Sequence, residues 1–153
     1  MSRIAIAIGA AAVLLVANTV SADSPKDAVQ YRQSVMESLG GHMGAIAKLT
    51  KHEVSYNHLL DQAKALADTA PMVSDIFPAN SKPSDDPKTH ALAKIWQQPE
   101  DFHKKVMAFQ MAAKAFLADV QSGDQSKVMG GVKQLGMSCG GCHREYRKKM
   151  QRH

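Results

Sequence analysis

The chain has 153 residues, of which 44% are hydrophobic and 22% are charged, and its formal net charge is +5 at neutral pH. This length provides for one domain with a hydrophobic core. The positive charge is mild and comes without a basic patch interleaved with aromatic residues, so no nucleic-acid partner is expected.

The N-terminus has the three parts of a secretory signal peptide. Arg3 provides the positive start, residues 4–16 form an apolar run, and small residues precede a cleavage position after Ala22. An uncleaved anchor is the alternative, but the uncharged stretch is marginal for a spanning helix of about 20 apolar residues. We therefore expect a signal peptide over residues 1–22, a mature domain over residues 23–153, and no membrane attachment after cleavage.

The mature region shows the helical period, and no window alternates as a half-buried strand does. The first helical window runs from Val29 to Ile46, and Pro25 suits its start. Its apolar stripe, with spacings of three and four, includes Arg32, Met36 and Met43.

A second helical window runs from Tyr56 to Ala70 and is followed by Pro71. A long connection then leads to Pro99. Its central part, residues 78–87, is rich in Pro, Ser and Asp and is predicted to be an exposed loop.

The third window runs from Phe102 to Val120 and ends at Gly123, a typical residue after a helix C-terminus. The fourth runs from Val128 to Tyr146, with Asp124 as the expected N-cap. Four amphipathic windows predict an all-α protein, namely an antiparallel four-helix bundle.

The sequence Cys139-Gly140-Gly141-Cys142-His143 has the Cys-x-x-Cys-His pattern of c-type haem attachment. The two thiols would form thioether bonds to one haem, and His143 would be an axial ligand of its iron. The chain has no other cysteine. A disulfide and a thioredoxin-like redox pair are the alternatives, but the first closes a very small loop. The second belongs at the start of a helix that follows a strand.

The second axial position is left open by the residues alone. Met36 and Met43 both lie on the inward stripe, about 10.5 Å apart along a helix, so only one can reach the iron. His42 beside the stripe is a weaker candidate, and both methionines could simply fill the core. Large aromatic residues are either haem contacts or core: Trp96, Phe102 and Phe109.

The chain resembles the class II c-type cytochromes, the family of cytochrome c′ and of the low-spin cytochrome c-556. The resemblance covers essentially the whole mature region and includes the haem motif near the C-terminus. It is carried by the following segments: Tyr31 to Met36, Gly44-Ala45-Ile46, Ile95-Trp96 with Phe102, and Cys139 to Lys148.

This resemblance implies roles for particular residues. In cytochrome c′ the position of Met36 is usually apolar and the iron stays five-coordinate, whereas the c-556 branch uses a methionine there as sixth ligand. It therefore favours Met36 over Met43. It also places Arg32 near a haem propionate and Arg147 beside the proximal face. Snorkelling of Arg32 to the end of the bundle is the alternative.

The function expected from the resemblance is one-electron transfer in the bacterial periplasm by one haem c per chain, with redox proteins as partners. Binding of nitric oxide or carbon monoxide, as in cytochrome c′, is the alternative and requires an open iron. A haem enzyme such as a peroxidase is not expected, because Glu37 and His42 lie off the Met36 face. Homodimers occur among such proteins, and the helical stripes neither require nor exclude one.

Overall fold

Four long helices and two short ones make up the residues that the computed structural model describes, 24–55 and 57–149. The expected signal peptide lies outside this range. No strand occurs within it, although Ala91 and Arg147 form an isolated antiparallel bridge. In chain order the helices are α1 (Pro25–Thr50), α2 (Leu59–Thr69), the 3₁₀ helix η1 (Ala70–Ser74), α3 (Lys94–Gln97), α4 (Pro99–Ser122) and α5 (Gln125–Tyr146).

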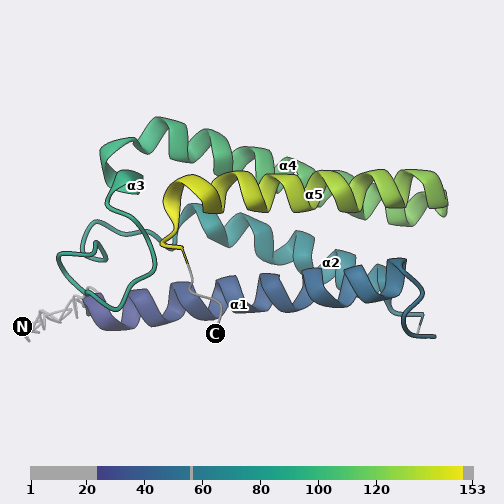
Figure 1. The fold of residues 1–153 in the computed structure, drawn as a ribbon, viewed down its shortest axis with the longest axis horizontal. Coiled ribbons are helices and arrows are strands. Elements are labelled where there is room, and N and C mark those ends of the chain that lie inside the picture. Colours follow the sequence, from purple (N-terminus) through teal and green to yellow (C-terminus); the bar gives the residue numbers. More distant parts are fainter. Residues whose placement is uncertain (1–23, 56, 150–153) are drawn as a thin grey trace, which may run out of the picture.

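The long helices α1, α2, α4 and α5 form an antiparallel bundle, which confirms the predicted fold class (Figure 1). Each helix contributes a side chain with less than 2% of its surface exposed: Ile46, Leu66, Phe116 and Leu135. The neighbouring pair α1 and α5 pack less extensively than the other neighbouring pairs of long helices. The bundle is therefore packed least extensively on the side between α1 and α5.

The helix ends follow the capping residues of the sequence. The Ser24 hydroxyl accepts a hydrogen bond from the Asp27 amide, and Pro25 is the first residue of α1. Gly123 ends α4 with a φ of 70°, a left-handed conformation that glycine adopts without strain. The Asp124 carboxylate caps α5 by accepting from the amides of Ser126 and Lys127. Gly123 and Asp124 therefore confirm the predicted boundary between α4 and α5.

The second helix begins at Leu59, later than the apolar spacing predicts, and Tyr56 is not among the described residues. The antiparallel reversal after α1 uses the intervening residues, and His52 adopts a φ of 57° there. The second predicted helical window therefore included residues that precede the helix in the structure.

The connection between η1 and α3, residues 75–93, differs from a simple exposed loop. Half of residues 78–87 are exposed and most of the others are partly buried, while Ser81 and Thr89 have 0% and 1% of their surface exposed. The reason is a buried partner, Arg32, whose contacts are described below. Within the described residues, no helix is long and apolar enough to cross a membrane.

Candidate functional site

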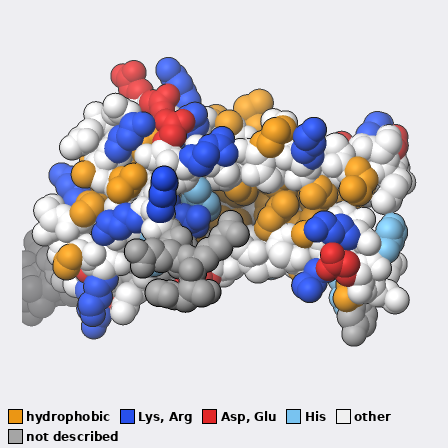
Figure 2. Space-filling model, in the orientation of Figure 1, with side chains coloured by type: hydrophobic (Ala, Val, Ile, Leu, Met, Phe, Trp, Pro, Cys, Tyr) orange, Lys and Arg blue, Asp and Glu red, His pale blue; other side chains and the backbone are white. Residues whose placement is uncertain are grey.

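A cavity of about 250 Å³ lies between α1, α5 and the connection. Met36 lines it from α1, Cys142 and His143 line it from α5, and most of its remaining wall is apolar. Figure 2 shows hydrophobic side chains gathered along the line between α5 and α1. The haem motif and the predicted methionine ligand, more than 100 residues apart in sequence, therefore meet at one cavity.

The two cysteines lie in the C-terminal half of α5, both half-buried and not joined in a disulfide. Burial raises the pKa of the Cys139 thiol, and burial with the neighbouring Cys139 raises the pKa of Cys142 to about 11. Both are therefore neutral thiols near pH 7. Thioredoxin-like pairs instead have a lowered thiol pKa at a helix N-terminus. Both thiols also lie in the C-terminal half of α5, away from a helix N-terminus, and this position argues against the redox-pair alternative.

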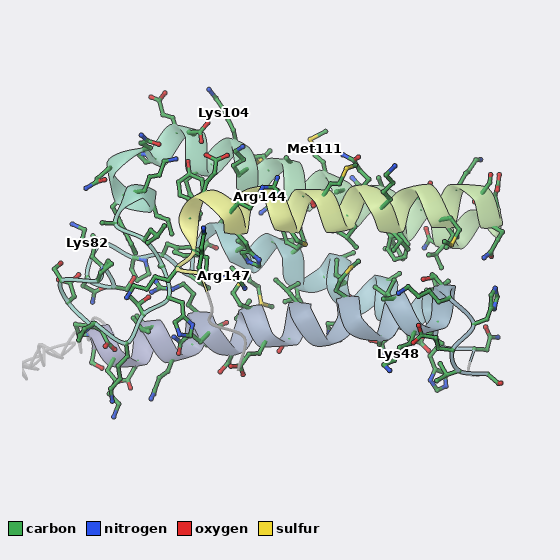
Figure 3. All side chains as sticks on the ribbon, in the orientation of Figure 1. Lys48, Lys82, Lys104, Met111, Arg144 and Arg147 are labelled. Carbon is green, nitrogen blue, oxygen red and sulfur yellow. The ribbon has the colours of Figure 1, made fainter. Side chains whose placement is uncertain are left out.

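His143 lies on the cavity wall and is partly buried. Burial lowers its pKa, and the positive charge of Arg147 lowers it further. Its imidazole is consequently neutral at neutral pH, and a neutral ring nitrogen is the form that binds a metal. Arg147 also lines the cavity, and Figure 3 shows it at the C-terminal end of α5.

Of the three candidates for the second axial position, only Met36 lines the cavity. Met43 is directed to another part of α5, where its Cε would lie 3.9 Å from a Cβ built on Gly136. The His42 Nδ1 is 2.8 Å from the Gln62 Oε1, in a hydrogen bond between α1 and α2. Both methionines are half-buried, so their position relative to the cavity, and not their burial, distinguishes them.

The three aromatic residues predicted as haem contacts also differ in their position relative to the cavity. Phe102 lines the cavity and has edge contacts with Phe77 and Tyr146, at centroid distances of 4.8 and 5.2 Å. Trp96 lies outside the lining and donates from its indole nitrogen toward the carbonyls of Phe77 and Pro78. Phe109 belongs to the hydrophobic core and is outside the lining as well. Of the three predicted contacts, Phe102 is the one that lines the cavity, and its contact with a haem stays a prediction.

Arg32 lines the cavity with 3% of its surface exposed, so it does not snorkel to the end of the bundle. Its guanidinium donates to Ile76, Ser81 and Thr89 of the connection. Burial lowers its pKa, and Asp86 partly offsets this effect. The propionate contact implied by the resemblance stays a prediction, and the partners that the structure shows are in the protein.

The part of the wall that the connection provides, including Phe77, Thr89, His90 and Ala91, was not expected from the sequence. This segment has neither helical nor strand periodicity that could indicate a buried face. Its one local signal is the apolar pair Ile76-Phe77, directly before the Pro-rich and Ser-rich stretch.

Glu37 also lines the cavity with Met36, so the expectation that this carboxylate lies away from Met36 was wrong, whereas His42 is outside the lining.

The residues at the cavity fit a c-type haem. Thiols for covalent attachment, a neutral imidazole and a thioether sulfur come from two facing helices, and apolar side chains dominate the remaining wall. These are donor types that hold haem iron in cytochromes. A thioether and an imidazole without a carboxylate cluster do not suit a hard cation such as calcium.

Comparisons with known proteins agree with this geometry. A family model described as cytochrome C′ matches residues 27–147. Cytochrome c-556 from Agrobacterium tumefaciens (strain II Chrys) is 31% identical over 121 residues, which cover 79% of this chain and 97% of that protein.

Solved structures show the same fold. Cytochrome c prime from Shewanella frigidimarina has a TM-score of 0.77 and 31% identity, covering 84% of this chain and 100% of that one. The nitric oxide complex of a cytochrome c prime variant from Alcaligenes xylosoxidans has a TM-score of 0.75 and 27% identity, covering 82% and 98%. The protein therefore belongs to the cytochrome c′ family of electron-carrying haem proteins, whose cofactor is covalently bound haem c.

Proposed function

We propose that this protein is a one-electron carrier with a six-coordinate, low-spin haem c. Cys139 and Cys142 hold the haem, and His143 and Met36 bind its iron from α5 and α1. The observation that carries the proposal is that His143 and Met36 line one cavity from two helices, whereas Met43 and His42 do not line it.

When bound, the haem supplies an iron that takes up and releases a single electron. The protein's own residues set the conditions. Met36 offers a soft thioether, which favours the reduced iron and raises the potential. Phe102 and the apolar wall keep water from the cavity, and the neutral His143 requires no proton release before it binds a metal.

We place the protein in the bacterial periplasm, where the expected signal peptide would deliver it. Redox proteins are its partners in this proposal. A catalytic role is not proposed, since the predicted ligands leave no open position on the iron for a substrate.

Gas binding is the second candidate function, and one specific observation favours it. Several solved structures of similar fold are cytochrome c prime proteins, among them a nitric oxide complex. For this chain, gas binding requires Met36 to leave the iron or to be absent from it.

The absorption spectrum of the purified ferric protein tests the proposal. We expect a low-spin spectrum with the weak far-red band of methionine-to-iron charge transfer. A high-spin spectrum without this band would contradict the proposal and favour gas binding.

Met36→Leu should convert the protein to a high-spin form that takes up carbon monoxide rapidly in the ferrous state. Met43→Leu is the matched control, because Met43 is a half-buried methionine on the same helix that contacts α5 outside the cavity. If Met36→Leu keeps the low-spin spectrum, or if Met43→Leu abolishes it, the ligand assignment is wrong.

A further inference from the structure

Arg32 is the one charged side chain among the buried residues that the structure describes, with 3% of its surface exposed. It lies one helical turn before Met36, and residues four apart on a helix lie on the same face. A buried charge requires hydrogen-bonding partners, since an unpaired one costs several kcal/mol. The identity of these partners therefore shows what Arg32 does.

Among the described residues, the hydrogen-bond acceptors of the Arg32 guanidinium all belong to the connection. The Nη1 atom donates to the Ser81 hydroxyl at 2.7 Å and to the Ile76 carbonyl at 3.2 Å. The Nη2 atom donates to the Thr89 hydroxyl at 2.7 Å and to the Ser81 carbonyl at 3.1 Å. One side chain of α1 thus fastens three separate points of the connection.

Two aromatic rings complete the environment of Arg32. Its guanidinium carbon lies 4.8 Å from the centroid of Phe77 and 5.8 Å from that of Trp96. A cation over an aromatic face is stabilised by the quadrupole of the ring. Since Phe77 also lines the cavity, Arg32 orders part of the cavity wall in addition to the loop.

The other end of the connection is fastened to the haem-bearing helix. The Leu92 amide donates to the Tyr146 carbonyl at 2.9 Å, and the Lys148 amide donates to the His90 carbonyl at 2.8 Å. Tyr146 and Lys148 follow His143 closely in the chain. The connection is therefore attached to α1 through Arg32 and to the end of α5 through its backbone.

The attachment of the connection to both helices matters because α1 and α5 provide the two predicted iron ligands. These two helices pack less extensively than the other neighbouring pairs of long helices. Figure 1 shows the connection at the end of the bundle where α1 begins and α5 ends.

We propose that Arg32 is a positioning residue that fastens the connection to α1, holds Met36 in place at the cavity, and so limits how often Met36 leaves the iron. This inference rests on the proposed function, because it requires Met36 to be the ligand. A propionate contact of Arg32 is not required. Substitutions of the loop partners Ser81 and Thr89 should therefore change how firmly Met36 is held at the cavity, although neither residue is a predicted iron ligand.

We call the attachment of the connection to α1 through Arg32 the clamp. Thr89→Val tests the clamp with a change that keeps the side-chain shape. It removes the acceptor of Arg32 and of the Ala91 amide, which donates to the same hydroxyl at 3.2 Å. Thr89→Ser keeps the hydroxyl and should restore wild-type behaviour. Thr50→Val is the matched control, because Thr50 is also buried but bonds within the far end of α1.

The readouts are the rate of carbon monoxide binding to the ferrous holoprotein and the far-red methionine band of the ferric holoprotein. In Thr89→Val we expect binding to be about tenfold faster or more, as for the loss of one buried hydrogen bond, and a weaker band. Amide hydrogen exchange should also accelerate in residues 76–92. Thr50→Val should leave the rate within about twofold of wild type even where it lowers stability equally.

The outcomes distinguish the two proposals. A low-spin wild type whose Thr89→Val and Ser81→Ala variants bind carbon monoxide like Thr50→Val would overturn the clamp alone. A high-spin wild type would overturn both the clamp and the Met36 assignment. If Thr89→Val and Thr50→Val accelerate binding to the same degree, the effect is general destabilisation and the clamp is also overturned.

Discussion

Replacing Phe102 with leucine tests whether the aromatic wall of the cavity holds the haem. Phe102 has 9% of its surface exposed and makes edge contacts with Phe77 at 4.8 Å and Tyr146 at 5.2 Å. Phe116 is the matched control. It lies on the buried face of the same helix with 0% exposed, but outside the cavity lining.

The expected loss of stability is similar for the two variants. Each aromatic edge pair contributes about 0.5–1.5 kcal/mol beyond its buried area, so Phe102→Leu should lose about 1–3 kcal/mol. Phe116→Leu leaves a small cavity in a fully packed core and should also cost about 1–3 kcal/mol. The unfolding free energy alone therefore does not separate a cavity residue from a core residue.

The haem spectrum does separate them. Phe102→Leu should shift the visible bands and let water or carbon monoxide reach the iron faster, whereas Phe116→Leu should keep both properties of the wild type. Thermal unfolding of the holoproteins, followed by circular dichroism, measures the common loss. Equal spectral changes in the two variants, or none in Phe102→Leu, would refute Phe102 as a haem contact.

Two further predictions concern pH and the contacts around the end of α5. Burial and a hydrogen bond to Asp101 raise the pKa of Tyr146, so its contribution to stability is complete below the unfolded value of about 10 and is lost as pH rises above it. Tyr146→Phe should remove this alkaline loss in urea titrations, and an unchanged alkaline slope would contradict it. Hydrogen bonds from Lys105 and then Lys94 lower the pKa of Glu145, so its contribution is present above about pH 4.3 and disappears as pH falls through the lowered value. Glu145→Gln should be less stable than wild type at pH 7 and equal to it near pH 2, and a difference that persists in acid would exclude this ion-pair origin.

The bundle could be predicted from the sequence because its signals are local. Apolar spacing defined the inward faces, and the Gly123-Asp124 pair marked the boundary between α4 and α5. The start of α2 was placed too early, because the predicted window included Asn57 and His58, which precede the helix in the structure. The Cys-x-x-Cys-His motif is local too, and its geometry follows from one helix.

The remaining parts of the site depend on contacts between distant segments. Periodicity treats Met36 and Met43 alike, and only the register of α1 against α5 separates them. Arg32 did carry a signal, since a charged residue on an apolar stripe needs a buried partner. Its protein partners lie 44 to 57 residues away in a segment without periodicity, so the sequence could not identify them, and the propionate contact stays a prediction. A charge on an inward stripe therefore indicates that some group must meet it, and in this chain the loop that meets it also closes the cavity beside Met36.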